Sequence, residues 1–244
     1  MNCLLPIISL CAFSVSASAA VIVYENDFST PIGSGYGFSE SSDAQWSVGS
    51  GVYINTITGD SASAANLSLP SVPGNNFVVT TVFTVPTIPA SGNFSVGFSA
   101  LSNSGTTDFY LADISNSGTL RLGAFNTGTF SAFSGTTLSG TALGNLISGE
   151  TYTMTLTGTY VGTSLTLALA VNDGANTATL TGTAPNAAKT GTYFGYRDRV
   201  NTAGEVGTIR FDHLNVTIPE PASSLALGIG VMGGIFKRRR SRIE

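Results

Sequence analysis

Apolar and polar residues alternate along most of the chain between residues 21 and 218. Tyr152, Met154 and Leu156 are each followed by a threonine, and the segment 165–171 continues the same spacing. A period of two places successive side chains on opposite faces of a strand. No eleven-residue window in this region keeps a helical period. The pattern therefore predicts strands whose outer face is polar but carries little charge.

Short turn signals separate these strands. They are Asn103-Ser104-Gly105, Asn116-Ser117-Gly118, Ser148-Gly149 and Asn172-Asp173-Gly174. The last of them predicts a hairpin over residues 166–182. About twelve short strands in a single unit are typical of an antiparallel two-sheet sandwich. We expect this sandwich to occupy residues 20–218.

The final predicted strand changes its phase of alternation. Ile209 and Phe211 share one parity, whereas Leu214 and Val216 share the other. An extra residue in one strand of a pair produces such a change, so we expect a β-bulge or bend at Asp212-His213.

Three segments resemble parts of concanavalin A-like jelly rolls. The segments 23–28 and 211–217 resemble the edges of those domains, and 146–152 resembles the run that leads into a central back-sheet strand. The resemblance implies an all-β antiparallel jelly-roll sandwich whose first and last strands pair.

The N-terminal residues are typical of a secretory signal peptide. An apolar run extends from Leu4 to Val15, and Ala17-Ser18-Ala19 offers small residues for cleavage. We therefore assign residues 1–19 to a signal helix; the alternative is a buried first strand. Cys3 and Cys11 are the only cysteines, so the mature chain would contain no disulfide, thiolate zinc site or cysteine nucleophile.

The C-terminal residues 219–244 combine three features. Pro219-Glu220-Pro221 precedes an uncharged run over residues 222–236, which precedes a basic cluster. As a helix the run would span about 22 Å, enough for a short transmembrane helix if flanking cations reach the lipid headgroups. The positive-inside rule predicts that Lys237, Arg238, Arg239, Arg240 and Arg242 stay cytoplasmic.

This tripartite end resembles the PEP-CTERM sorting signal of Gram-negative bacteria. The resemblance implies that an exosortase recognises Pro219, Glu220 and Pro221. It also implies a transient inner-membrane intermediate, followed by display at the cell surface or in an extracellular biofilm matrix that contains polysaccharide. The alternative is a membrane anchor that no enzyme processes.

The charge distribution excludes one class of partner. Residues 21–218 hold five basic and twelve acidic residues, a net charge of −7. Nucleic-acid binding depends on clustered cations that neutralise phosphates. We therefore expect no nucleic-acid partner.

Few residues suit catalysis. His213 is the only histidine, which excludes a histidine-rich metal site, and its place at the predicted bulge favours a structural role. Glycoside hydrolysis needs two facing carboxylates, but the four glutamates of the body lie far apart in sequence. The sequence therefore predicts that the protein is not an enzyme.

Two sets of residues have the chemistry of a binding site. Asp27, Asp60, Asp173 and Asp212 lie at predicted turns or strand ends and offer oxygen ligands for Ca²⁺, although acids at turns are usually solvated.

The second set is Trp46, Tyr196 and Arg197, which have the aromatic and guanidinium groups that bind sugars. The alternative places both rings in the core, with Arg197-Asp198-Arg199 at the start of a loop.

The sequence as a whole predicts an exported, noncatalytic surface or matrix protein. One alternative is a lectin-like module that binds extracellular polysaccharide. A second alternative is a glycoside hydrolase or lyase on a jelly-roll scaffold. No cofactor is expected, apart from the Ca²⁺ that the four aspartates would offer to bind.

Overall fold

The computed structural model describes residues 20–29, 38–40, 45–59, 61–90, 93–103, 108–184 and 189–219. These residues form sixteen strands and no helix, which confirms the all-β prediction. Val21–Ile218 form one compact unit. The predicted signal helix at 1–19 and membrane helix at 222–236 lie outside the described residues.

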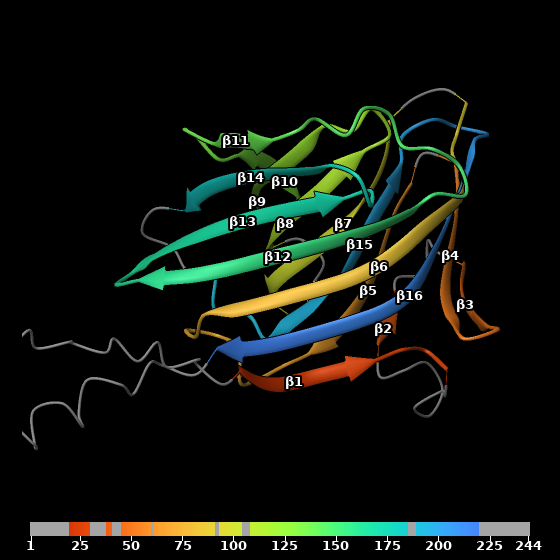
Figure 1. Ribbon diagram of the computed structural model, residues 1–244. Helices are drawn as coiled ribbons and strands as arrows, with labels where there is room; N and C mark the ends of the chain where they lie inside the picture. The colour runs from red at the N-terminus through yellow and green to blue at the C-terminus, as the bar shows by residue number, and fades with distance from the viewer. Residues whose placement is uncertain are drawn as a thin grey trace, which may run out of the picture. The chain divides into compact units, whose positions relative to one another are not determined.

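The strands form two antiparallel sheets (Figure 1). Sheet A has nine strands in the order β11 (Thr137–Gly140), β14 (Thr177–Ala184), β13 (Ser164–Asn172), β12 (Thr151–Val161), β6 (Phe77–Thr87), β16 (Val206–Pro219), β4 (Val52–Thr58) and β3 (Gln45–Gly49), with β1 (Ala20–Asn26) paired beside β16. Sheet B has seven, in the order β10 (Thr129–Ala132), β9 (Leu120–Asn126), β8 (Phe109–Ser115), β7 (Phe94–Ser102), β15 (Tyr193–Val200), β5 (Ser61–Ser68) and β2 (Ser39–Glu40). The pairing of β1 with β16 confirms that the first and last strands are neighbours.

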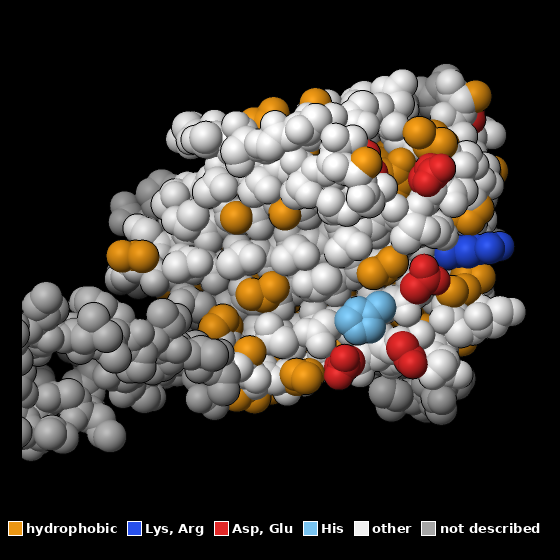
Figure 2. All heavy atoms as spheres, viewed as in Figure 1, with side chains coloured by type: hydrophobic (Ala, Val, Ile, Leu, Met, Phe, Trp, Pro, Cys, Tyr) orange, Lys and Arg blue, Asp and Glu red, His pale blue; other side chains and the backbone are white. Residues whose placement is uncertain are grey.

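Sheet A follows the predicted alternation closely. In β12, Tyr152, Met154 and Leu156 are buried, while the intervening threonines are partly exposed or exposed. On the outer face, Thr80 and Thr155 from neighbouring strands hydrogen-bond to each other through their hydroxyl groups at 3.2 Å. Figure 2 shows few charged side chains on the face over β12 and β13. Threonine therefore keeps this surface polar with little charge.

The predicted break in the final strand is confirmed. The pairing of β16 with β6 shifts register between Phe211 and His213, and again between Thr208 and Arg210. Phe211 and Leu214 are both buried although their positions differ by an odd number. The shift therefore keeps apolar residues of both phases facing the core.

The expectation of a loop at Arg197-Asp198-Arg199 is wrong. All three residues lie within β15, and the side chain of Asp198 is completely buried. One oxygen of Asp198 accepts a 2.7 Å hydrogen bond from the Asn55 side chain, and the other accepts a 3.3 Å bond from the Gly97 backbone. These bonds satisfy the buried carboxyl inside a strand, so the charged run does not end the strand.

The central strands of sheet B are covered on both faces. Every residue of β7 and β8 is buried, whereas strands of sheet A alternate between buried and partly exposed residues. One face of sheet B packs on the core between the sheets. The other, which we call the outer face of sheet B, must also be shielded, and the candidate site lies there.

Candidate ligand-binding site

A pocket of about 290 Å³ lies on the outer face of sheet B. In β15, Tyr196 and Val200 face the core, so Arg197 and Arg199 face outward. The same alternation in β7 and β8 turns Ser95 and Asp113 to this face. The lining residues are Ala62, Ser95, Leu111, Asp113, Arg121, Phe125, Phe130, Arg197 and Arg199. They come from β5, β7, β8, β9, β10 and β15, so the pocket spans six of the seven strands.

Two glycines on this face leave room for lining side chains of the pocket. A Cβ at Gly97 would lie 2.4 Å from the Cβ of Asp113, and one at Gly123 would lie 2.5 Å from the Phe130 ring. Real Cβ atoms do not approach so closely, so neither position accepts a larger residue without rearrangement of the lining side chains. Glycine at these two positions therefore allows the Asp113 side chain and the Phe130 ring to pack directly against the backbone.

An ion pair forms one side of the pocket. The Arg121 guanidinium donates two hydrogen bonds to Asp113, one of them from Nε to Oδ1 at 2.8 Å. The two residues are directly paired across β8 and β9. Burial raises the pKa of Asp113, while the bonds from Arg121 act in the opposite direction; the same contact raises the pKa of Arg121. The pair is held in a bidentate geometry and contributes no net charge to the pocket.

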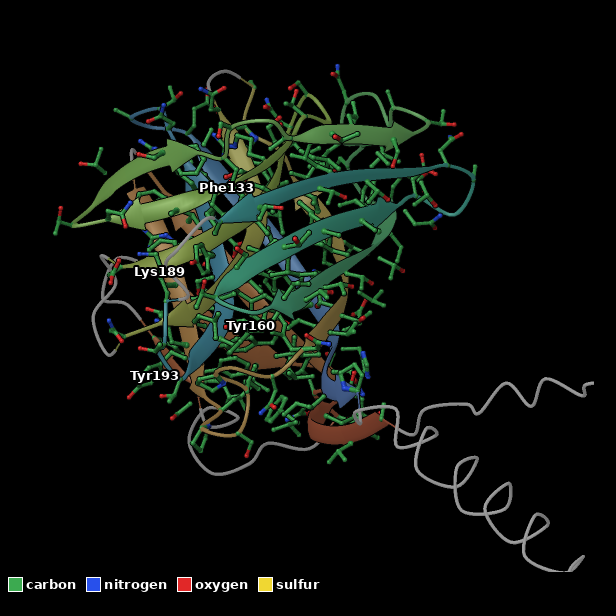
Figure 3. The ribbon with its side chains drawn as sticks, turned by 90° about the vertical axis from the view of Figure 1, so that its left-hand side faces the viewer. Phe133, Tyr160, Lys189 and Tyr193 are labelled. Carbon is green, nitrogen blue, oxygen red and sulfur yellow. The ribbon has the colours of Figure 1, made fainter. Side chains whose placement is uncertain are left out.

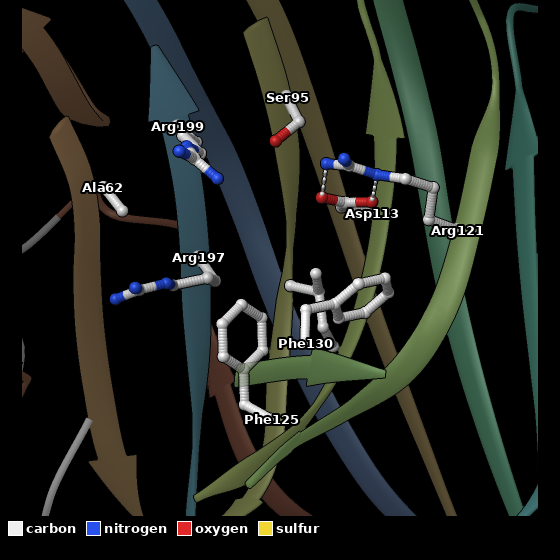
Figure 4. Close-up of a pocket in the computed structure, with 9 residues that line it drawn as sticks. Ala62, Ser95, Asp113, Arg121, Phe125, Phe130, Arg197 and Arg199 are labelled. Atoms are coloured by element: carbon white, nitrogen blue, oxygen red, sulfur yellow. Dashed lines mark hydrogen bonds and ion pairs between the residues drawn. The ribbon is translucent and has the colours of Figure 1, made fainter. Parts of the chain in front are cut away.

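Arg197 and Arg199 bring two further cations to the pocket. The guanidinium carbon of Arg197 lies 5.4 Å from the centre of the Phe109 ring, within the range of a cation–π contact. Nη2 of Arg199 donates a 2.7 Å hydrogen bond to Oδ1 of Asn201. Figure 4 shows these two arginines on the side of the pocket opposite the Asp113–Arg121 pair. The arginines are thus oriented by existing contacts.

Aromatic rings form the remaining wall. Phe125 stacks on Phe109 with ring centres 4.6 Å apart, and Phe130 lies 5.5 Å from Phe125 at a tilt. Phe125 and Phe130 are partly exposed. Apolar rings beside a small number of oriented polar groups are typical of a small-molecule or sugar site.

Of the three residues that the sequence suggested for sugar binding, the structure brings Trp46 and Tyr196 together, with ring centres 6.2 Å apart, and separates Arg197 from them. Tyr196 is completely buried, and its hydroxyl group lies 3.0 Å from the hydroxyl of Thr81. Trp46 is partly buried and stacks on Tyr53 at 4.7 Å. The structure therefore places both rings in the core, as the alternative interpretation had it, while Arg197 lies on the opposite face of sheet B and lines the pocket.

Sequence reasoning missed most of the pocket, although one signal was present. Asp113 and Arg121 lie symmetrically about Ser117, the centre of the predicted Asn116-Ser117-Gly118 turn. Residues equidistant from a hairpin turn pair directly across its strands. That rule would have found the ion pair, and Phe125 and Phe130 are likewise direct partners across the β9–β10 hairpin. Arg199, in contrast, reaches the pocket only because β15 pairs with β7, a strand distant in sequence.

Three of the four aspartates considered for Ca²⁺ lie in the described part of the chain, and they do not form a group that would hold a metal ion. Asp173 accepts hydrogen bonds from the backbone of Ala175 and Asn176, which lowers its pKa, and Asp27 accepts bonds from Ser29. Burial raises the pKa of Asp212, and Asp60 lies outside the described residues. Within the described ranges, no three residues of the types His, Cys, Asp and Glu are grouped in a way that would hold a metal ion.

His213 lies in β16 at the register shift. Its Nε2 is 3.7 Å from a carboxylate oxygen of Glu25 on β1. Because β1 pairs with β16, this contact joins the first and last strands of the chain.

A second pocket of about 260 Å³ lies near β9, β10 and β14. Figure 3 labels two of its lining residues, Phe133 and Lys189. The Lys189 ammonium pairs with Asp108 and donates a 2.9 Å bond to the side chain of Asn126. The cation of this pocket is therefore engaged by a carboxylate of the same chain.

Most of the residues assigned to the sorting signal lie outside the described part of the chain. Pro219 ends β16, whereas Glu220, Pro221 and the basic cluster at Lys237, Arg238, Arg239, Arg240 and Arg242 are not described. Among the described residues, none forms a helix of the length and apolar character needed to cross a bilayer.

Comparison with protein families gives one match. Residues 217–241 match the PEP-CTERM protein-sorting motif. This match confirms the resemblance, and it indicates a protein that a Gram-negative-type bacterium exports and sorts to its surface. No curated protein sequence matches the chain.

Solved structures share the fold. A protein of unknown function from Shewanella oneidensis MR-1 is 16% identical, with a TM-score of 0.56 over 83% of this chain and 88% of that one. Lectin UEA-II, solved with galactose, is 13% identical with a TM-score of 0.52, over 82% of this chain and 99% of that one. Lectin I-B4 from Griffonia simplicifolia is 11% identical with a TM-score of 0.50, over 82% and 98%. At these identities the likeness shows that the body is a lectin-like β-sandwich, and it shows the fold alone.

Proposed function

We propose that the protein is a noncatalytic surface or extracellular-matrix protein that reaches its destination through exosortase processing of its tail. The observation that carries this proposal is the match of residues 217–241 to the sorting motif. The tail holds the protein in the inner membrane as an intermediate, with the sandwich on the far side and the basic cluster in the cytoplasm.

Mass spectrometry of the protein recovered from the cell surface tests this proposal. Processing predicts a mature chain that lacks Lys237–Arg242. In cells without the exosortase, the same segment should remain attached and the protein should stay with the inner membrane. Surface material that carries the intact basic cluster in normal cells would contradict processing.

A second function, lectin-like binding of extracellular polysaccharide, is favoured by the pocket on the outer face of sheet B. It combines two partly exposed phenylalanines with oriented arginines, and two of the solved structures that share its fold are lectins. Similarity of fold alone does not indicate function, so this proposal depends on the residues of the pocket.

A glycan array tests binding by this pocket. We expect selective binding by the full-length chain in detergent, and loss of about tenfold in affinity when Phe130 is replaced by alanine. The matched control is Phe133→Ala, which removes a partly exposed ring from the second pocket. Equal loss in both variants would mean that the change acts through stability and would count against this pocket.

The third candidate, a glycoside hydrolase or lyase, has less support. Hydrolysis of a glycosidic bond requires two carboxyl groups about 5–9.5 Å apart. Asp113 is the single carboxylate among the described lining residues of the pocket, and Arg121 holds it in an ion pair. Asp198 is buried in the core. This arrangement supports binding without catalysis.

A further inference from the structure

The basic residues of the body are concentrated in one place. Residues 21–218 contain only five lysines and arginines, and three of them, Arg121, Arg197 and Arg199, line the pocket on the outer face of sheet B. The described lining includes one carboxylate, that of Asp113. The lining side chains therefore carry a net charge of +2 in a body whose net charge is −7. A positive pocket on an acidic protein selects for an anionic ligand.

We propose that this pocket binds the carboxylate of a hexuronic acid residue in an acidic polysaccharide. The proposal rests on the lectin-like function and specifies the sugar that the site selects. Arg197 and Arg199 contact the carboxylate, while the Phe125 and Phe130 rings pack against the apolar C–H face of the sugar.

The chemistry of the lining favours a carboxylate among anions. A guanidinium is planar and its fork of N–H donors matches the two oxygens of a carboxylate. The pocket already contains one such pair, because Arg121 binds the Asp113 carboxylate through two parallel hydrogen bonds. A guanidinium has five N–H donors and can bond to several acceptors at once.

The spacing of the two arginines suits one sugar residue. Positions two apart on a strand lie about 7 Å apart along the same face, which is close to the width of a pyranose ring with its substituents. The volume of about 290 Å³ is near the lower end of ligand pockets and suits one monosaccharide unit of a longer chain.

The acidic body disfavours a densely charged ligand. DNA carries a negative charge about every 1.7 Å, and its binding requires that several phosphates be neutralised together. Outside the pocket, the body offers only Lys189, which is paired with Asp108, and Arg210. A polysaccharide with occasional carboxylates places its charge in the pocket and neutral sugars elsewhere.

The test compares trigalacturonate with the same trisaccharide after reduction of its carboxyl groups, by isothermal titration calorimetry on the full-length chain in detergent. We expect binding of trigalacturonate that weakens with salt, and at least about tenfold weaker binding of the reduced sugar. Arg197→Gln and Arg199→Gln should each lose at least about tenfold in affinity. The matched control is Arg210→Gln, which removes the same charge from an exposed position on β16 of sheet A and should change affinity less than twofold.

The outcomes separate this inference from the functions on which it rests. Equal binding of both sugars, with Arg197→Gln and Arg199→Gln unaffected, would leave lectin-like binding intact and overturn the preference for a uronate. A sulfated disaccharide or a short oligonucleotide that binds as tightly as trigalacturonate would also overturn it, because the site would then be a general anion site. Absence of binding to either sugar and to the glycan array would remove both binding proposals. Export and processing of the tail are tested separately, by mass spectrometry of the protein recovered from the cell surface.

Discussion

At the scale of single residues, the least expected group is the carboxyl of Asp198. It is completely buried in the core, where Asn55 and the Gly97 backbone donate to it, and Ser63 lies beside Asn55. Burial raises the pKa of Asp198 to about 7, although the hydrogen bonds from Asn55 and the Gly97 amide act to lower it. A strand position that is otherwise apolar thus holds a carboxyl that is easily neutralised. Because it faces the core, it has no part in the pocket on the other face of the sheet.

The raised pKa predicts how stability depends on pH. In the unfolded chain an aspartate loses its proton near pH 4, whereas in the folded protein Asp198 keeps it up to about pH 7. Between these values the folded state binds more protons, so the free energy of unfolding falls as pH rises. The loss should be on the order of 3 kcal/mol across this window.

Replacement of Asp198 by asparagine isolates this contribution. Asp198→Asn removes the titrating group but keeps the acceptor for the Gly97 amide. Urea unfolding at pH 4.5 and pH 7.5 should show a smaller loss of stability in the variant than in the wild-type protein. The exposed Glu150→Gln removes a charge of the same sign and should keep the wild-type dependence. A wild-type dependence in Asp198→Asn would show that other groups cause it.

At the scale of strands and sheets, the sequence predicted what depends on local periodicity. The alternation in β12 and β13, the hairpin after Asn172 and the shift in β16 depend on neighbours close in the chain, and the structure confirms them. The short strands β2, β10 and β11 were not predicted, because two to four residues are too few to show a period.

The pocket could not be predicted from periodicity, which does not show which distant strands pair or which face of a strand is buried. Its two sides come from β15 and from β8 and β9, which meet because β7 pairs with both β8 and β15. Alternation shows that Tyr196 and Arg197 face opposite sides, but it does not show which side is the core. The charged run at 197–199 favours a loop from sequence alone, because charges rarely lie inside strands that are covered on both faces. Here Arg197 and Arg199 face outward and line a pocket, and Asp198 accepts hydrogen bonds in the core.

At the scale of the whole molecule, the sorting motif and the sandwich share residues. The motif begins at residue 217, whereas β16 ends at Pro219. Thr217 pairs with Val78 of β6, and Leu214 and Val216 are buried in the core. The last strand of the fold therefore continues directly into the motif, without a spacer. Processing of the tail must spare β16, which lies between β6 and β4 within sheet A.

This overlap limits where the mature chain ends. A chain truncated after Ile218 keeps every buried residue of β16 and should unfold at nearly the same temperature as the full-length protein. A chain truncated after Asp212 loses Leu214 and Val216, and leaves β6 without the partner that pairs with Val82 to Val78. Burial of each such side chain contributes about 1.5–3 kcal/mol, and a typical domain is stable by only about 5–15 kcal/mol. We therefore expect the shorter chain to be unfolded or aggregated by circular dichroism and gel filtration. If it instead melted like the longer one, the C-terminal half of β16 would not be needed for the fold, and processing upstream of Thr217 would be compatible with a folded surface protein.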